Sequence, residues 1–175
     1  MKKLADLMIL TVLILFAFTG CANNAVMSPD ADVMQNSANS TEKNIVYENK
    51  DYGFKFTLPA SWENYKIING TWEGRSAEAE SEKLETGPVI SIRHPLWTAE
   101  NPRQDIPIMV LTVKQWEALQ KGEFHIGAAP IGPTELGRNS KYVFALPARY
   151  NYAFPEGFEE VEKILQNKPL EPIEK

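Results

Sequence analysis

The chain has 175 residues, of which 18 are basic and 23 acidic, so its formal net charge at pH 7 is −5. No cluster of lysine and arginine interrupts this acidic balance. The sequence therefore lacks the electrostatic pattern of a nucleic-acid-binding protein, and we expect no nucleic-acid partner. Cys21 is the only cysteine, which excludes an intrachain disulfide.

The first twenty residues have the pattern of a secretory signal peptide. Lys2 and Lys3 precede an apolar run, 7–18, in which Thr11 is the only polar residue. As a helix this run would be roughly 18 Å long, against about 30 Å for the hydrocarbon core of a bilayer. A permanent membrane span is therefore not expected, and residues 1–20 are predicted to be a signal peptide.

The apolar run ends in Phe18-Thr19-Gly20-Cys21, which resembles the lipobox of bacterial lipoproteins. Gly20 and Cys21 match the two strictest positions of that motif, and Phe18 stands where an aliphatic residue is usual. The resemblance implies that Cys21 carries a diacylglyceryl group, which holds the protein on the extracytoplasmic face of the cell membrane. Two acyl chains give stable attachment, whereas a single chain binds only marginally.

The composition changes after the cysteine. Residues 22–44 are rich in Asn, Ser and Ala and contain no aromatic residue. Such a segment cannot bury enough apolar surface to offset its ordering entropy. Residues 21–44 are therefore predicted to be a lipidated cysteine and a flexible tether, with an end-to-end distance of about 26 Å. Residues 45–175 then suffice for a single domain with its own core.

The domain begins with a predicted β-hairpin. A short β-rich stretch, 45–48, and a stretch of alternating apolar and polar residues, 54–58, flank a group of turn residues. Alternation places one set of side chains on a single buried face, namely Phe54, Phe56 and Leu58.

Further strand patterns follow along the chain. The stretch 106–113 is the most continuously apolar, which suggests a central strand covered on both faces. Trp62, in the turn after the first hairpin, is expected to pack back into the core. The remaining predicted strands are 65–68, 71–74, 88–93 and a second hairpin formed by 134–139 and 141–146.

Two helices are predicted. Thr112 and Gln115 have the spacing of a capping box ahead of a helix at 113–121, which Gly122 ends. A second helix, 156–167, carries one apolar stripe and an acidic first turn. Strands joined by short turns cannot be parallel. We therefore predict an α+β fold, with a mainly antiparallel sheet of about six strands sandwiched with two or more helices.

One segment carries a resemblance to a known family. Residues 52–62, Tyr-Gly-Phe-Lys-Phe-Thr-Leu-Pro-Ala-Ser-Trp, are similar to the opening of PsbP-like domains. The resemblance implies a largely antiparallel sheet of about six strands between helices, and many bacterial members are small lipoproteins of unknown role. Members of this fold have unrelated functions, so no activity is implied.

The residues favour no catalytic, cofactor or metal site. The two histidines, His94 and His125, lie 31 positions apart without a cysteine partner, unlike a histidine metal motif. There is no Gly-x-Ser-x-Gly nucleophile motif and no phosphate-binding glycine loop. Carboxylates that could act in acid–base pairs are dispersed near the ends of the predicted elements: Glu63, Glu73, Glu100, Asp105, Glu123 and Glu135. We expect no catalytic residue, no cofactor and no metal.

The segment 93–103 is the strongest candidate for ligand contact. It combines cationic, aromatic and proline residues in a long loop, and ordered loops of this kind often carry function. The candidate contacts are Arg93, His94, Trp97 and Arg103. Most of the other aromatic residues, such as Trp72, Trp116, Tyr152 and Phe154, are expected to fill the core, and the alternative is an exposed binding platform.

These patterns favour a membrane-anchored, non-enzymatic binding module whose partner is an envelope protein or a peptide or glycan ligand. Two alternatives remain open. One is an extracytoplasmic hydrolase with dispersed carboxylates, which predicts a pocket containing two buried acids or a His–acid pair. The other is an accessory subunit of an envelope complex.

Overall fold

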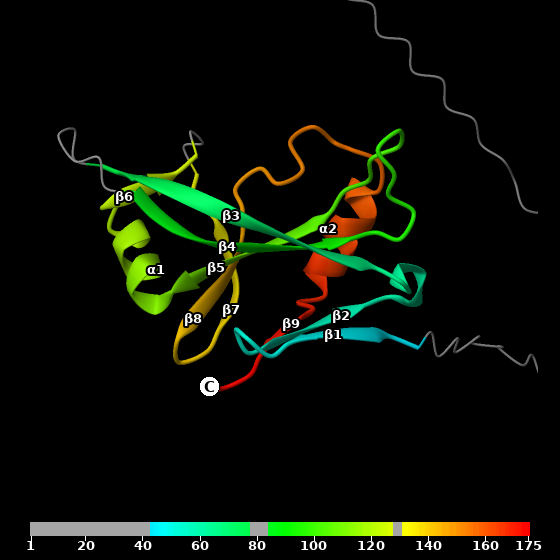
Figure 1. Cartoon of the computed structure of the whole chain (residues 1–175), viewed down its shortest axis with the longest axis horizontal. Helices are drawn as coiled ribbons and strands as arrows, with labels where there is room; N and C mark the ends of the chain where they lie inside the picture. The colour runs from blue at the N-terminus through cyan, green and yellow to red at the C-terminus, as the bar shows by residue number, and fades with distance from the viewer. Residues whose placement is uncertain (1–42, 78–83, 128–130) are drawn as a thin grey trace, which may run out of the picture. The chain divides into compact units, whose positions relative to one another are not determined.

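The computed structural model of the chain describes residues 43–77, 84–127 and 131–175 (Figure 1). All of them belong to one compact unit, Ser40–Lys175. The predicted signal peptide, the lipobox cysteine Cys21 and the predicted tether up to residue 42 lie outside the described residues. Within the described part, no helix is both long and apolar enough to cross a membrane.

The described residues form nine strands, two α-helices and one short 3-10 helix (Figure 1). The helical elements are η1 (Ala60–Trp62), α1 (Val113–Gln120) and α2 (Phe158–Gln166). The strands are β1 (Ile45–Asn49), β2 (Phe54–Leu58), β3 (Lys66–Ser76), β4 (Leu84–Arg93), β5 (Ile106–Thr112), β6 (Phe124–Ile126), β7 (Thr134–Arg138), β8 (Tyr142–Leu146) and β9 (Leu170–Pro172).

The strands make two antiparallel sheets. The larger sheet has six strands in the order β6-β3-β4-β5-β8-β7, and the smaller has three in the order β1-β2-β9. Every strand pair in both sheets is antiparallel. The fold is therefore of the α+β class with a mainly antiparallel sheet, as predicted, and the small second sheet is an addition to that prediction.

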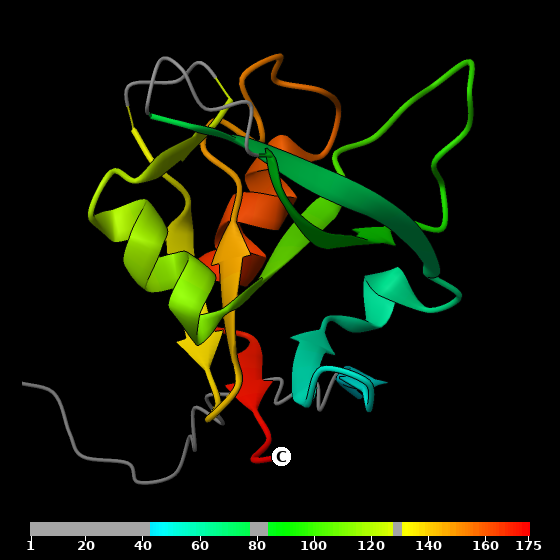
Figure 2. The ribbon, with the colours of Figure 1, turned by 60° about the vertical axis from the view of Figure 1, so that its left-hand side comes forward.

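The central strand β5 separates two apolar cores. Ile106, Ile108 and Val110 point into the larger core, which also contains the buried face of β2 and residues of α2. Met109 and Leu111, on the opposite face of the same strand, pack with Trp116 of α1 in the smaller core. The small sheet and α2 thus cover one face of the large sheet, and α1 covers the other (Figure 2).

Elements encoded by local patterns are confirmed. In the first hairpin, Phe54, Phe56 and Leu58 are fully buried, and Trp62 is 1% exposed. At α1, the Thr112 side chain accepts a hydrogen bond from the backbone N–H of Gln115, and the Gln115 side chain accepts one from the backbone N–H of Thr112. The second hairpin, β7–β8, also forms as predicted.

Several predictions of element bounds differ from the structure, and two strands were not predicted. The strand expected at 88–93 begins earlier, at Leu84, as β4. The two strands expected at 65–68 and 71–74 are one long strand, β3, because Asn69 and Gly70 pair in register with β4 instead of forming a turn. Helix α2 starts two residues later than expected, since Gly157 adopts a left-handed conformation with φ of 82°. Strands β6 and β9 were not predicted, because each has three residues and is defined by pairing with a strand distant in the sequence.

Candidate functional site

Two long loops meet beside the N-terminal end of α2. Loop 94–105 joins β4 to β5, and loop 147–157 joins β8 to α2. They touch through a parallel bridge between Arg103 and Glu156, where the backbone N–H of Gln104 donates to the Glu156 carbonyl at 2.8 Å. The two loops are visible in Figures 1 and 2 as the green and orange segments that leave the large sheet beside α2.

Arg93 and Trp97 form the first of two side-chain groups in this region. The Arg93 guanidinium donates to both carboxylate oxygens of Asp105, with its Nη2 at 2.8 Å from Oδ2. Its central carbon lies 3.8 Å from the centre of the Trp97 ring. The ion pair raises the pKa of Arg93. Because Arg93 is the last residue of β4 and Asp105 directly precedes β5, this group closes the base of loop 94–105.

His94 belongs to the second group and is buried, with 4% of its surface exposed. Its Nδ1 accepts a hydrogen bond from the backbone N–H of Leu96 at 3.1 Å. The ring lies edge-on to Trp62 with 4.9 Å between centres, and its Nε2 is 3.9 Å from Glu160 Oε2. Burial, and then the nearby Arg103, lower the pKa of His94, while Glu160 and Glu156 oppose the shift.

Arg103 joins loop 94–105 to α2. Its Nη1 forms an ion pair with Glu156, and its Nη2 lies 3.8 Å from Glu160 Oε2. The Arg103 side chain is only 15% exposed. Both arginines of the sequence-predicted contact set are thus engaged in internal ion pairs, and they fix the loop at two separate points.

Glu160 is the residue that sequence reasoning missed. Its Oε1 accepts hydrogen bonds from the Ser61 hydroxyl at 3.0 Å and from the Trp62 indole N–H at 3.1 Å. Its Oε2 faces His94 and Arg103. In the sequence, Glu160 is one of several acids in the first turn of a helix, where acids are expected because they favour the helix dipole. No local spacing could have distinguished it.

The structure decides which aromatic residues are core and which are surface. Trp62, Trp72 and Trp116 are buried. Tyr152 and Phe154 are 77% and 66% exposed, and Leu96 is 66% exposed. These three lie on the two loops that meet at Arg103, and they are three of the seven large apolar side chains that stand exposed among the described residues.

Phe154 adds a strained backbone to its exposure. Its φ of 46° lies in the left-handed region, which bulky residues rarely adopt. The ring packs edge-on against Phe158 at 5.1 Å between centres, which holds it in place at the start of α2. Strained backbone of this kind is often found at functional sites, so Phe154 is a candidate for partner contact.

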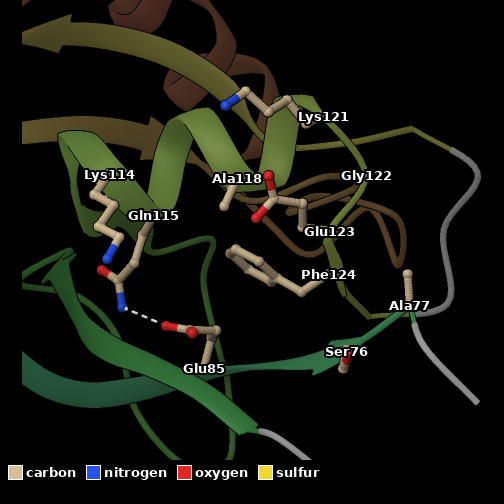
Figure 3. A pocket seen from close by; sticks show the side chains of 10 residues that line it. All are labelled: Ser76, Ala77, Glu85, Lys114, Gln115, Ala118, Lys121, Gly122, Glu123 and Phe124. Carbon is tan, nitrogen blue, oxygen red and sulfur yellow. Dashed lines mark hydrogen bonds between the residues drawn. The ribbon is translucent and has the colours of Figure 1, made fainter. Parts of the chain in front are cut away.

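A hollow of about 580 Å³ lies on the other side of the molecule, between α1 and the ends of β3 and β6 (Figure 3). Its charged lining is balanced, since it contains two lysines, Lys114 and Lys121, and two glutamates, Glu85 and Glu123. Gln115 donates from Nε2 to Glu85 at 3.2 Å and to the Thr86 carbonyl at 3.1 Å, and its Oε1 caps α1. The Gln115 side chain, which lines this hollow, therefore serves the fold.

A second hollow, of about 620 Å³, runs along α2 past Ser61 and Glu160. The arrangement there is not a nucleophile triad, because the carboxylate lies between the hydroxyl and the imidazole. Ser61 donates to Glu160 and not to His94. A hydroxyl nucleophile needs a base within hydrogen-bond reach, normally an imidazole that a carboxylate orients from its far side.

Two of the dispersed carboxylates named from the sequence form ion pairs with arginines. Asp105 is paired with Arg93, and Glu135 with Arg138, which lowers the pKa of Glu135. His125 is exposed on β6, in register with Arg75. Over the described part of the chain, no group of three or more His, Cys, Asp or Glu side chains is placed to hold a metal ion.

Comparison with protein-family models, with curated proteins and with solved structures finds no match to this chain.

Proposed function

We propose that this protein is a lipid-anchored, extracytoplasmic binding module that recognises an envelope protein through loops 94–105 and 147–157. The observation that carries the proposal is that both loops are fixed internally and yet expose Leu96, Tyr152 and Phe154. Exposed apolar side chains on ordered loops are a common feature of protein interaction surfaces.

The energetics favour such a surface. Burying a leucine or phenylalanine side chain contributes about 1.5–3 kcal/mol, and aromatic residues are enriched among the dominant contacts of interfaces. Association is weakened by the cost of ordering loops. Here the ion pairs Arg93–Asp105 and Arg103–Glu156 order loop 94–105 before any partner binds.

A protein partner fits the surface better than a glycan. Glycan recognition uses flat aromatic faces for stacking, and Leu96 offers none. A pair of loops that exposes an aliphatic side chain as well as aromatic ones is suited to an apolar protein partner.

The anchor is part of the proposal. A diacylglyceryl group on Cys21 and a tether of about 26 Å would keep the domain close to the membrane surface. Both segments lie outside the described residues, so the proposal rests on the sequence pattern Phe18-Thr19-Gly20-Cys21.

A PsbP-like domain is the finer fold assignment that we propose. It is supported by the similarity of residues 52–62 and by a six-stranded antiparallel sheet with a helix on each face. The assignment would not identify a partner, because the fold serves unrelated functions.

The alternative of a hydrolase receives less support from the geometry. His94 and Glu160 do form a His–acid pair, but their polar atoms are 3.9 Å apart and His94 is 4% exposed. The His94 imidazole is buried and lies beyond hydrogen-bond distance of the Glu160 carboxylate. It is therefore poorly placed to accept a proton from a substrate. An accessory subunit is a binding module whose partner carries the activity, and the experiment below covers it.

The test is site-specific photo-crosslinking in intact cells. A benzophenone amino acid is placed at Leu96 or Phe154, and matched control sites are Val46 and Leu84, which are 53% and 50% exposed. We expect one discrete protein adduct from the loop positions and not from the controls. The purified protein should compete for that adduct saturably.

Substitution then gives a quantitative check. Leu96→Ser, Tyr152→Ser and Phe154→Ser together should weaken binding of the identified partner by about hundredfold, since two or three lost apolar contacts of about 1–1.5 kcal/mol each have that effect. The matched control combines Val46→Ser, Ile68→Ser and Leu84→Ser. Equal weakening by both sets, or adducts from the control positions alone, would exclude the two-loop surface.

The anchor has its own check. Cys21→Ser should abolish incorporation of labelled fatty acid and move the protein from the membrane to the soluble extracytoplasmic fraction, because no second cysteine can take the lipid. Persistent membrane attachment of this variant would contradict the proposed lipidation.

A further inference from the structure

His94 is the one buried titratable side chain at the start of loop 94–105, and the proposed binding surface makes no use of it. Its Nδ1 accepts the backbone N–H of Leu96, and its carbonyl accepts the backbone N–H of Trp97 at 3.0 Å. The first turn of the loop is therefore held by one side-chain and one backbone hydrogen bond from the same residue.

The side-chain bond defines the proton position. An imidazole nitrogen that accepts a hydrogen bond carries no proton, so neutral His94 has its proton on Nε2, which faces Glu160. Protonation would place a second N–H at Nδ1, directly opposite the N–H of Leu96. Two donors cannot bond to each other, so the gain of one proton removes this hydrogen bond.

The charges around His94 come from its own loop and from around the start of α2. Arg103, on the same loop, repels an imidazolium, whereas Glu160 in the first turn of α2 and Glu156 just before that helix attract one. On the side of His94 that faces η1, the neighbouring group is the uncharged ring of Trp62. Protonated His94 is thus drawn toward α2 at Nε2 while it loses its bond to the loop at Nδ1.

We propose that His94 is a pH-sensitive latch: protonation at Nδ1 breaks its hydrogen bond to Leu96 and releases the first turn of loop 94–105. The latch can be tested independently of the proposed function, because the measurements on His94 and on the Leu96 amide need no binding partner. Burial lowers the pKa of His94, so release is expected at mildly acidic rather than neutral pH.

The test follows the two histidines of the full-length protein by NMR from about pH 8 to about pH 5, together with hydrogen exchange of the Leu96 amide corrected for its intrinsic rate. We expect His94 to titrate below the ordinary pKa of a histidine. Protection of the Leu96 amide should fall by roughly fivefold to tenfold with the same midpoint as His94, the effect of losing one hydrogen bond.

Two matched variants separate the latch from general acid effects. In His94→Asn, the side-chain oxygen can accept the same N–H two residues on, as in an Asx turn, but it does not titrate in this range. Leu96 protection should then be independent of pH. His125→Asn, which removes the exposed histidine, should keep the wild-type transition.

Several outcomes would overturn the latch. One is unchanged Leu96 protection while His94 becomes protonated, and another is the same loss of protection in His94→Asn. If that variant does not fold, the proposal is tested by the ring-nitrogen chemical shifts of wild-type His94, which report its tautomer and its protonation. A neutral ring protonated at Nδ1, or a ring that stays neutral down to about pH 5, excludes the proposal.

Discussion

Two polar junctions hold distant segments of this domain together, and they are built in opposite ways. The Asn139 junction joins the second hairpin to the first hairpin and the C-terminal strand: Asn139 Nδ2 lies within 2.9–3.1 Å of the carbonyls of Tyr52, Gly53 and Ile173. The His94 junction joins loop 94–105 to α2 through His94, Arg103, Glu156 and Glu160.

The difference lies in charge and in how completely polar atoms are bonded. Asn139 is uncharged, and its Oδ1 also accepts from the N–H groups of Lys141 and Tyr142. Beside the His94 junction, the described residues contain two buried polar side-chain atoms without a hydrogen-bond partner, Arg103 Nε and Gln104 Oε1. A fully bonded neutral junction is suited to stability, whereas a charged and incompletely bonded one can be rearranged at low cost.

The largest expected effect is at Asn139. Asn139→Ala should lower the free energy of unfolding by about 3–4 kcal/mol, because several backbone groups lose their partner in a buried site. Urea denaturation at neutral pH measures the loss. Asn151→Ala is the matched control, since Asn151 makes a single half-buried bond to Glu162 and should cost about 1 kcal/mol or less. Equal costs for the two variants would contradict the contrast between the junctions.

A pair of glycines tests rigidity directly. Gly53 and Gly157 both have positive φ, 79° and 82°. A Cβ at Gly53 would lie 2.7 Å from the Ile173 carbonyl oxygen, which is backbone, whereas at Gly157 it would meet the Arg103 Nη2 at 3.2 Å, which a flexible side chain can move.

Gly53→Ala should therefore cost at least about 2 kcal/mol of stability, against about 1 kcal/mol for Gly157→Ala, where only the backbone conformation is strained. Denaturation of both variants under one set of conditions gives the comparison. A larger loss of stability in Gly157→Ala than in Gly53→Ala would contradict this comparison. It would show that the Asn139 junction is the more easily deformed of the two.

The smallest effect is expected from pH. The pKa of His94 in the folded protein is below its ordinary value, because burial and Arg103 disfavour the imidazolium. The unfolded chain then binds the proton at higher pH than the folded one. The stability that this difference in the pKa of His94 contributes is complete above about pH 6.5. It is lost as pH falls toward the pKa of His94 in the folded protein.

Denaturation at a series of pH values isolates this contribution. The difference in unfolding free energy between wild type and His94→Asn should shrink as pH falls below about 6.5. The difference between wild type and Asn139→Ala should stay constant, since Asn139 does not titrate. If the unfolding free energies of wild type and His94→Asn changed with pH in parallel, His94 would not be the source of this pH dependence.

The parts of the fold that the sequence predicted rest on neighbouring residues. The alternation of Phe54, Phe56 and Leu58 and the capping box of Thr112 and Gln115 are encoded within a few positions, and both are confirmed. Strands β6 and β9 depend on partners far away in the chain, so three residues of pattern could not reveal them.

The same distinction applies to the candidate site. The segment containing Arg93, His94, Trp97 and Arg103 was identified by composition, but its pairing depends on Asp105, on Glu156 in loop 147–157 and on Glu160 in α2. Glu160 gains its role only because α2 packs beside η1 and loop 94–105. Sequence could name the loop, and the tertiary arrangement decides which of its side chains hold the loop and which face outward.

The order in which the small sheet is assembled has a consequence for folding. Strand β2 lies near the start of the domain, and its partner β9 comprises three of the last residues, with Phe56 opposite Leu170. Contacts between segments so far apart form late in folding. The edge of β2 that pairs with β9 therefore stays unpaired until the distant segment that carries β9 folds back onto the first hairpin.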